Sequence, residues 1–253
     1  MSRWKYILVL LCWPPVAVAG CPHLQPDEEV LVRHVIDGDT VILKDDRVIR
    51  FIGVDAPELN KHNNGLPEFG AEAARDWLVN KIVKQSQLKL VFGVKRRDDY
   101  GRWLAHPLTS EGELLVTQML TQGLGRLMLF PPNHDYWPCW LEAERQARRS
   151  RRGIWSIPLA ATPVAAGWQQ LSGLVVRGIS GRGRLELVLE GELRIRAGKR
   201  LPSEARHRLA LLGPGDRLFV RGWVRPAGNG WQLWLNHPWQ FYQEKVSDCA
   251  GQC

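Results

Sequence analysis

The chain has 253 residues, of which 45% are apolar and 24% charged, a composition that excludes a disordered or low-complexity protein. Its length allows one large domain or two small ones. A formal net charge of +8 favours an anionic partner such as nucleic acid or a membrane surface, although many basic proteins bind neither specifically.

The first residues have the pattern of an export signal, predicted to span 1–20. A basic start precedes an apolar run that is too short for a membrane span. The end of the run allows two cleavages: A-V-A at 17–19 suits ordinary signal peptidase, whereas V-A-G-C at 18–21 is similar to a bacterial lipobox. We favour the lipobox and membrane anchoring through a lipidated Cys21, because a cysteine at this junction is otherwise unexplained. Both cleavages predict an exported protein, in the bacterial cell envelope (periplasm or outer membrane) or secreted.

The five cysteines bear on the same question. Cys12 is removed with the signal, and Cys21 carries lipid in the favoured interpretation, which leaves Cys139, Cys249 and Cys253 in an oxidising compartment where pairing is expected. Their odd number means that one thiol is free or that Cys21 also pairs. The C-x-x-x-C spacing of the last two favours a disulfide over zinc, because no histidine or second cysteine pair lies nearby.

In chain order, 21–28 is predicted to be a tether that leads to the first strand. Alternating apolar residues predict strands at about 29–36, 39–44, 47–54 and 88–94. A polar loop at 59–67 precedes the first of three predicted helices, at about 68–84, 114–120 and 137–151. Because strands precede helices, the fold class of 29–157 is predicted to be α+β, a small closed sheet capped by helices.

The pattern changes at 158–167, an uncharged stretch with two prolines that is typical of a linker. Beyond it, 168–243 contains five predicted strands separated by glycine-rich turns, at 171–179, 184–189, 192–197, 216–224 and 231–235. Five short strands with a helix at about 202–211 between the third and fourth predict a small all-β barrel of the OB type. A tail, 244–253, carries the last two cysteines.

Tryptophans and arginines alternate in this second half. Five tryptophans lie among its arginines, at positions 168, 223, 231, 234 and 239. Barrels that bind single strands use such aromatic residues for base stacking and such arginines for phosphate contacts. Tryptophans that fill a small core, with arginines on the surface, explain the same pattern equally well.

Acidic side chains gather around one arginine at 35–58. Asp37, Asp39, Asp55 and Glu58 share this stretch with Arg50, which lies in the middle of a predicted strand. Because side chains alternate along a strand, Arg50 can face the acids beyond its end. Acids held together in this way need a cation or a bound anion to balance them. The stretch therefore indicates a metal-assisted phosphoryl site, whereas a solvated hairpin with an Asp-Gly turn is the more ordinary explanation of the spacing alone.

A second motif, D-D-Y-G-R-W-L-A at 98–105, distinguishes the two explanations. With it the chain resembles the staphylococcal nuclease (thermonuclease) family. The stretches that carry the resemblance run in the family's order with similar gaps, at 35–41, 50–58, 69–73, 98–105 and 153–156. The resemblance implies a five-stranded barrel of the OB type with capping helices over 29–157, to which the second barrel is an extension.

The resemblance also implies a calcium site. Asp39 and Asp55 would bind Ca²⁺ through their carboxylates, and Ala56 would contribute its main-chain carbonyl. The type enzyme has a threonine at this last position, but a main-chain ligand survives the change to alanine. Calcium is a hard cation that prefers oxygen ligands and tolerates irregular geometry.

The remaining roles concern the reaction itself. Glu58 resembles the general base or the group that positions the attacking water, and Arg50 and Arg102 would stabilise the charge of the transition state on the phosphate. Tyr100 matches a tyrosine that contacts the terminal phosphate of the substrate. Two positions depart from the family: Asp99 replaces a phosphate-binding lysine, and Met128 replaces a base-stacking tyrosine, with Phe130 two residues later.

The sequence thus predicts a secreted or envelope-anchored, calcium-dependent endonuclease that hydrolyses DNA and RNA with little sequence specificity. A monomer without a protein partner is expected. The first alternative is a nucleic-acid-binding envelope lipoprotein with an inactive nuclease barrel, and a second is a structural lipoprotein of the envelope.

Overall fold

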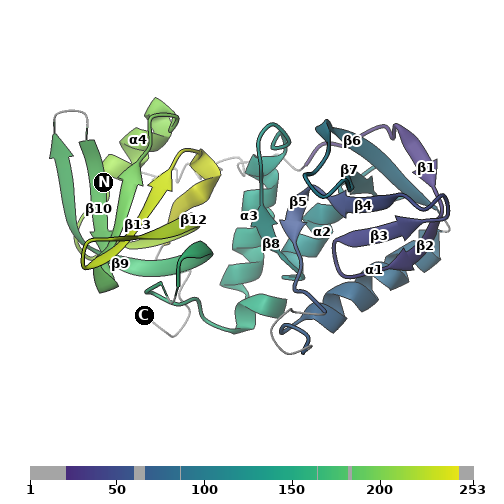
Figure 1. The fold of residues 1–253 in the computed structure, drawn as a ribbon, viewed down its shortest axis with the longest axis horizontal. Coiled ribbons are helices and arrows are strands. Elements are labelled where there is room, and N and C mark those ends of the chain that lie inside the picture. The colour runs from purple at the N-terminus through teal and green to yellow at the C-terminus, as the bar shows by residue number, and fades with distance from the viewer. Residues whose placement is uncertain (1–20, 60–65, 86, 164, 182–183, 245–253) are drawn as a thin grey trace, which may run out of the picture.

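The computed structural model describes residues 21–59, 66–85, 87–163, 165–181 and 184–244. Two β-sheets lie at opposite ends of an elongated molecule, and helix α3, Trp137–Arg149, stands between them (Figure 1). The predicted export signal and the predicted pairing of Cys249 and Cys253 lie outside the described residues.

The first sheet has six strands in the order β1-β6-β7-β4-β3-β2. These strands are β1 Glu28–Val30, β2 Val32–Val35, β3 Thr40–Leu43, β4 Val48–Phe51, β6 Leu88–Arg97 and β7 Trp103–Leu108. All neighbours are antiparallel except β4 and β7, which are parallel. The strand predicted at 47–54 is divided, because β5, Gly53–Asp55, leaves the sheet and pairs with β8, Arg126–Met128. The mixed sheet and its helices confirm the α+β prediction, and β8 is an element that the sequence pattern missed.

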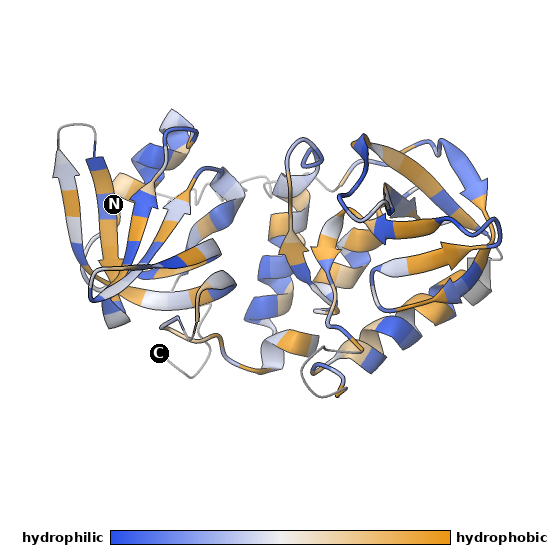
Figure 2. Cartoon of the chain, viewed as in Figure 1, coloured by the Kyte–Doolittle hydropathy of each residue, from blue (hydrophilic) through white to orange (hydrophobic). Residues whose placement is uncertain are grey.

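Helices cover this sheet and complete its core. Helix α1 is Ala71–Gln85, α2 is Leu115–Thr121, and a 3₁₀ turn, η1 Gly153–Ser156, follows α3. Apolar residues dominate the middles of the strands (Figure 2), and the core includes the fully buried Val41, Ile49 and Leu90. Each buried side chain of this size contributes about 1.5–3 kcal/mol relative to an exposed one.

The second sheet closes on itself. Its order is β13-β11-β10-β9-β12-β14, and β13 also pairs with β12, so that five strands form a ring and β14 adds to it from outside. The strands are β9 Gly167–Gly181, β10 Arg184–Leu189, β11 Leu193–Ala197, β12 Arg217–Ala227, β13 Gly230–Leu235 and β14 Phe241–Glu244. Helix α4, Ser203–Ala210, lies between β11 and β12 in the chain, with 3₁₀ turns η2 Glu190–Glu192 and η3 Pro238–Gln240 elsewhere. This all-β unit fits the predicted OB-like barrel.

A buried ion pair joins the two halves. Arg221 of β12 and Glu144 of α3 have side chains that are 3% and 0% exposed, and the guanidinium Nη2 donates to Oε2 of Glu144. Both side chains also hold Leu127 of β8: its N–H donates to Glu144 Oε1 at 2.8 Å, and its carbonyl accepts from Arg221 Nη1 at 2.7 Å. The second barrel is therefore docked on the first half through a buried ion pair and direct hydrogen bonds.

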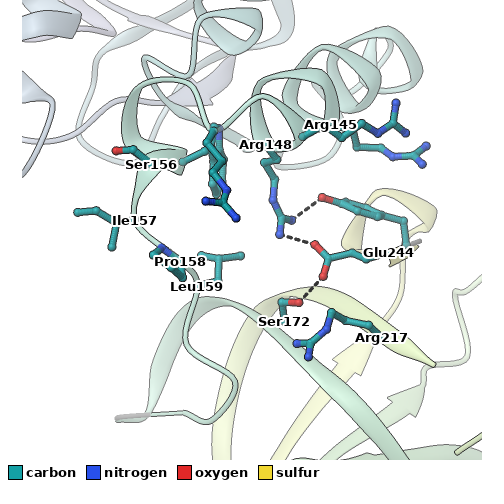
Figure 3. Close-up of a pocket in the computed structure, with 13 residues that line it drawn as sticks. Arg145, Arg148, Ser156, Ile157, Pro158, Leu159, Ser172, Arg217 and Glu244 are labelled. Atoms are coloured by element: carbon teal, nitrogen blue, oxygen red, sulfur yellow. Dashed lines mark hydrogen bonds and ion pairs between the residues drawn. The ribbon is translucent and has the colours of Figure 1, made fainter. Parts of the chain in front are cut away.

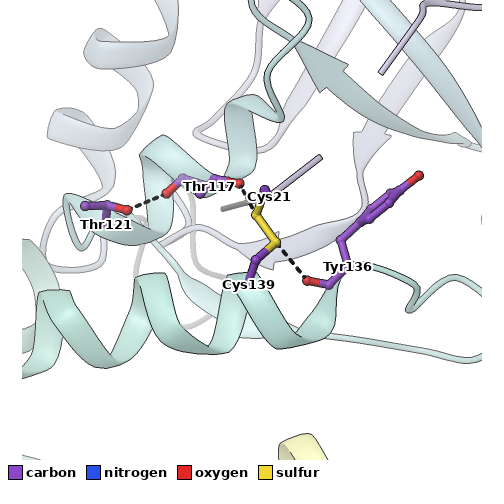
Figure 4. Close-up of a disulfide and its surroundings, with 5 residues drawn as sticks. All are labelled: Cys21, Thr117, Thr121, Tyr136 and Cys139. Carbon is purple, nitrogen blue, oxygen red and sulfur yellow. Dashed lines mark hydrogen bonds between the residues drawn. A yellow bond between two sulfur atoms is a disulfide. The ribbon is translucent and has the colours of Figure 1, made fainter. Parts of the chain in front are cut away.

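Cys21 lies in a disulfide, which corrects two predictions. Its Sγ is bonded to Sγ of Cys139 in α3, across 118 residues of sequence (Figure 4). A sulfur in a disulfide cannot also carry a thioether-linked lipid, so the structure contradicts the predicted lipidation of Cys21 and favours the pairing that the sequence left open. The segment 21–28 is also no free tether, because Leu24 N–H donates to Gly112 O and Asp27 N–H donates to Leu90 O, both at 2.8 Å. Among the described residues, no helix combines the length and the apolar character that a bilayer crossing requires.

Removing one partner of the buried pair should be costly. Glu144→Ala leaves the Arg221 guanidinium buried without a carboxylate, and we expect the free energy of unfolding to fall by about 3–5 kcal/mol. Urea denaturation at pH 7 measures this loss. Glu142→Ala on the same helix is the control: Glu142 is 37% exposed and pairs only at the surface, so its loss should cost less than about 1 kcal/mol. The double variant Glu144→Leu/Arg221→Leu should be more stable than Glu144→Ala, and equal losses would contradict the role of the pair.

His106 of β7 predicts an acid-sensitive fold. The ring is 4% exposed and packs edge-on against Tyr136, and burial lowers the pKa of His106 to about 4, against a small opposing effect of Asp135. Because the unfolded chain binds this proton near pH 6.5, stability should fall by about 3 kcal/mol as the pH drops from 6.5 to 4. His106→Phe keeps an aromatic ring and removes the proton site, so its urea midpoint should depend less on pH over this window. Parallel pH profiles for the two proteins would refute the prediction.

Candidate active site

The acidic loop between β2 and β3 depends on Gly38. A Cβ at this position would lie 2.7 Å from the Cβ atoms of both Ala56 and Ala74, so only glycine lets the loop rest against α1 and the segment after β5. This close approach brings Asp39 to Ala56, whose N–H donates to Oδ2 of Asp39 at 2.6 Å. Asp37 in turn accepts the N–H of Asp39 at 2.9 Å and fixes the turn. The D-G-D sequence is thus a rigid element rather than a solvated hairpin tip.

Arg50 lies between two of the carboxylates. Its side chain is 14% exposed, with Nη1 2.6 Å from Oδ2 of Asp39 and Nη2 3.2 Å from Oδ1 of Asp55. The carbonyl of Val54 accepts a further hydrogen bond from Nη1 at 2.9 Å. Strand β4 supplies Arg50 and β5 supplies Asp55, so the break between these strands turns the carboxylate back toward the guanidinium.

The carboxylates are not fully compensated by this one arginine. Burial raises the pKa of Asp39 to about 7, because the lowering effect of Arg50 is smaller, and the negative charges of Asp37 and Asp55 raise it further. Burial also raises the pKa of Asp55, against the lowering effects of Arg50 and Arg126. A site in which buried carboxyl groups are held toward their neutral form favours the binding of an additional cation.

Oxygen atoms are the donors that this site offers to a cation. The carboxylates of Asp39 and Asp55 meet at Arg50, and Ala56 follows with its main-chain carbonyl, which is the donor set that a hard cation such as calcium prefers. In the described part of the chain, no three His, Cys, Asp or Glu side chains converge closely enough to hold a metal ion by themselves. A cation held here would therefore take its other ligands from the main chain, water or substrate. The residues fit such an ion with an incomplete protein shell.

Glu58 lies on the exposed side of the same cluster. Partial burial and the charge of Asp37 raise the pKa of Glu58, whereas Arg50 lowers it. The main chain is fixed by a reciprocal pair, in which Glu58 N–H donates to Oε2 of Glu68 at 3.1 Å and Glu68 N–H donates to Glu58 O at 2.9 Å. An exposed carboxyl with a raised pKa beside an arginine is suited to accept or hold a proton of water.

Arg102 and Tyr100 form a separate cluster around Asp98. Oδ1 of Asp98 accepts the N–H groups of Tyr100 and Arg102, and Oδ2 accepts Nε of Arg102 at 2.7 Å. The guanidinium lies 5.5 Å over the ring of Tyr100, which is 88% exposed. Arg102 directly precedes β7, the neighbour of β4, yet the contacts of its side chain are with Asp98 and Tyr100 rather than with the acids around Arg50.

Several residues of the site were missed by sequence reasoning. Arg126 of β8 pairs in register with Asp55 and lowers its pKa, but nothing in the sequence placed β8 beside β5. Asp98 positions Arg102 by accepting hydrogen bonds from the N–H groups of Tyr100 and Arg102. An aspartate two residues before such a donor is typical of an Asx turn, and this spacing could have indicated the role of Asp98. Two positions depart from the family pattern. Asp99 forms an ion pair with Lys95 at 2.8 Å. Met128 lies opposite Gly53 in the pairing of β8 with β5, and Phe130, two residues later, is 60% exposed. Phe130 is therefore the exposed aromatic residue near the position of the lost tyrosine.

Comparisons with known proteins identify the family of the first half of the chain. The family model described as staphylococcal nuclease homologue matches residues 48–157. The thermonuclease of Staphylococcus intermedius is 34% identical over 131 residues, which cover 51% of this chain and 76% of that protein. The thermonuclease of Staphylococcus hyicus is 32% identical over 145 residues (56% and 83%), and endonuclease YncB of Bacillus subtilis is 33% identical over 148 residues (54% and 68%).

The match with the family model covers only part of what the structure assembles. Arg50, Asp55, Glu58 and Arg102 lie within it, whereas Asp39 precedes its first residue. The whole second barrel follows its last residue, 157. Arg221, which clamps β8, thus comes from a part of the chain that the family model does not include.

Proposed function

Because the chain belongs to the staphylococcal nuclease family and is therefore a nuclease that hydrolyses phosphodiester bonds, we propose that it is an exported endonuclease that cuts DNA and RNA in a calcium-dependent reaction with little sequence specificity. One observation carries this proposal: the buried guanidinium of Arg50 lies between Asp39 and Asp55, with Glu58 at the exposed edge of the same cluster. This arrangement can bind a phosphate, a cation and a water molecule side by side.

The arginines would act on the phosphate. Arg50 and Arg102 would hold its oxygens and stabilise the additional negative charge of the five-coordinate transition state, a task that suits the planar guanidinium better than an ammonium group. The bonds from Asp98 to the main chain and side chain of Arg102 support this role, since they orient the guanidinium before substrate arrives. Tyr100, exposed beside Arg102, would contact a terminal phosphate.

Glu58 would accept a proton from the attacking water or hold that water in line. Calcium would be held by Asp39, Asp55 and the carbonyl of Ala56, and when bound it would polarise the phosphate and acidify the water. The raised pKa values of both aspartates support a cation at this position, because a positive charge beside them restores their ionised form.

Export is the finer part of the proposal. The disulfide between Cys21 and Cys139 supports an oxidising compartment. We propose that the export signal is removed by ordinary signal peptidase after A-V-A at 17–19, which leaves Cys21 available for its partner in α3. The protein would then be free in the periplasm or outside the cell.

The outer face of the second barrel would add to substrate binding. Trp223 and Trp234 are 61% and 47% exposed, and with Phe130 they line a hollow of about 420 Å³ that also contains Arg225. Bases can stack on such rings while arginines contact phosphates. Trp239, which is 5% exposed, and Trp231, which packs on the core, instead fit the interpretation that tryptophans fill a small core.

The digestion of single-stranded DNA tests the proposed function. We expect cutting in calcium and none after chelation with EDTA, and Glu58→Gln and Arg102→Ala should each lower kcat by at least ~10²–10³-fold. Arg75→Ala in α1 is the control and should cut normally, because among the described residues Arg75 forms an ion pair with its exposed neighbour Asp76 alone. Full digestion by Arg102→Ala would remove Arg102 from the reaction, and the absence of digestion by the unaltered protein would favour an inactive binding barrel.

The aromatic face has its own test. Trp223→Ala and Trp234→Ala should each weaken binding of single-stranded DNA by about 1–3 kcal/mol, the value of one stacked base. Fluorescence anisotropy in EDTA measures binding without cutting. The control is Leu211→Ala, because Leu211 is an apolar residue that is 70% exposed and lies directly after α4. Unchanged affinity in both tryptophan variants would assign these side chains to the surface alone. Point variants are preferable to a truncation at residue 160, which would leave Glu144 without Arg221.

A further inference from the structure

A second cavity lies where the two halves of the molecule meet. It has a volume of about 180 Å³ and is lined from one side by α3 and the segment after it, and from the other by β9, β12 and β14 (Figure 3). Five of its lining residues are arginines, which we call the arginine pocket: Arg145, Arg148, Arg149, Arg151 and Arg217. Glu244 is the one acidic residue in the lining.

Arg148 and Glu244 form the fixed floor of this pocket. Arg148 donates to Glu244 and to the hydroxyl of Tyr242, and its guanidinium lies 4.2 Å from the ring centre of Phe219. The other carboxylate oxygen of Glu244 accepts from Ser172, so this acid is fully engaged. Arg148 and Glu244 therefore neutralise one another, and the described lining of the pocket contains no second acidic residue.

Arg145 is only partly compensated by its partners among the described residues. Arg145 and Arg149 share one acid, Glu142, at 3.2 and 3.3 Å. Nε of Arg145 is buried without a hydrogen-bond partner in the described part of the chain, and the guanidinium of Arg217 reaches the same cavity from β12. The end of a helix attracts the arginines of its own last turn, but it does not explain why a strand of the other barrel adds one more. Like charges that converge in this way call for an anion.

The backbone at Arg151 points the same way. Its φ is +51°, a left-handed conformation that glycine usually adopts after a helix and that costs an arginine about 1 kcal/mol. An arginine therefore occupies a position that favours glycine, and it lines the pocket.

The arginine pocket adjoins a hollow that reaches the surroundings of the candidate active site. This neighbouring hollow has a volume of about 280 Å³ and shares with the pocket the wall formed by Trp155, Ile157, Pro158 and Leu159. The neighbouring hollow is also lined by Glu68, which binds the N–H of Glu58, and by Arg126, the register partner of Asp55. Phe69 and Ile157 are 60% and 53% exposed along it and offer apolar surface to bases.

We infer that the arginine pocket is a subsite for the backbone phosphates of a single-stranded nucleic acid, which runs from the catalytic cluster along the hollow at Arg126 to the seam between the two barrels. This inference rests on the proposed function for the identity of the ligand. The second barrel then lengthens the substrate-binding groove, and the enzyme grips a strand at a distance from the bond that it cuts.

The test compares binding and cutting in a variant that keeps the fold. The double variant Arg145→Ala/Arg217→Ala removes two guanidinium groups and leaves Arg148 in place, because loss of Arg148 would unpair Glu244. The probe is a labelled single-stranded DNA longer than the ~4–16 nucleotides that one OB barrel covers, followed by anisotropy in EDTA. We expect at least ~10-fold weaker binding, and a decrease of about 1.4 in the slope of log affinity against log salt, since each lost contact contributes about 0.7 for a single strand.

A shorter substrate separates this subsite from the reaction centre. For a dinucleotide, kcat/KM of the double variant should equal that of the unaltered protein, whereas for the long strand KM should rise with kcat unchanged. Arg177→Ala is the matched control, because Arg177 of β9 forms an exposed surface pair with Glu192. This variant should change neither kcat/KM for the dinucleotide nor KM for the long strand. Unchanged affinity and salt slope in the double variant would overturn the inference while leaving the nuclease assignment intact. If the unaltered protein binds the strand through these arginines but cuts nothing, the proposed function fails and the subsite stands.

Inorganic phosphate is the second probe, because a free anion offers the same chemistry as a backbone phosphate. We expect it to bind at least ~10²-fold more weakly than the long strand, since the strand engages several sites at once. If titration calorimetry shows phosphate alone binding as tightly as the strand, and the double variant loses this binding, the pocket serves a small anion and the strand assignment is wrong.

Discussion

The buried carboxylate of Glu144 connects strand β8, and through it the candidate site, to the second barrel. This carboxylate accepts the N–H of Leu127 in β8 and pairs with Arg221 of the second barrel, and β8 in turn pairs with β5, which carries Asp55. A buried carboxylate is tolerated only when hydrogen bonds and an opposite charge surround it, so none of these elements can shift alone. The position of Asp55 in the candidate site thus depends on an arginine 77 residues from Glu144.

Local patterns were sufficient for most of the fold. The helix at 137–151 is observed as Trp137–Arg149 and the strand at 184–189 has the same bounds, because amphipathic periodicity and glycine-rich turns act over a few residues. Strands β7, β8 and β14 were not predicted. Strands β8 and β14 have no more than four residues each and are defined by partners distant in sequence. The separation of β5 from β4 escaped for the same reason.

The candidate site follows the same division. Arg50 and Asp55 are five residues apart, and alternation along a strand with a break after it was enough to bring them together. Glu144, Arg126 and Arg221 carried no local signal, because a buried charge is recognised only by what the fold places around it. The short motif at Cys21 misled for a related reason: four residues fit a lipobox, whereas the true partner of the sulfur lies in another element.

The ends of the two sheets limit how copies of this chain can meet. The first sheet terminates in β1 and β2, which have three and four residues, and the second terminates in β14 with four, since its other end is closed by the pairing of β13 with β12. Short edge strands present few unpaired amide groups to a neighbouring chain. This arrangement gives the chain a resistance to edge-to-edge aggregation, and its basic charge adds to that resistance.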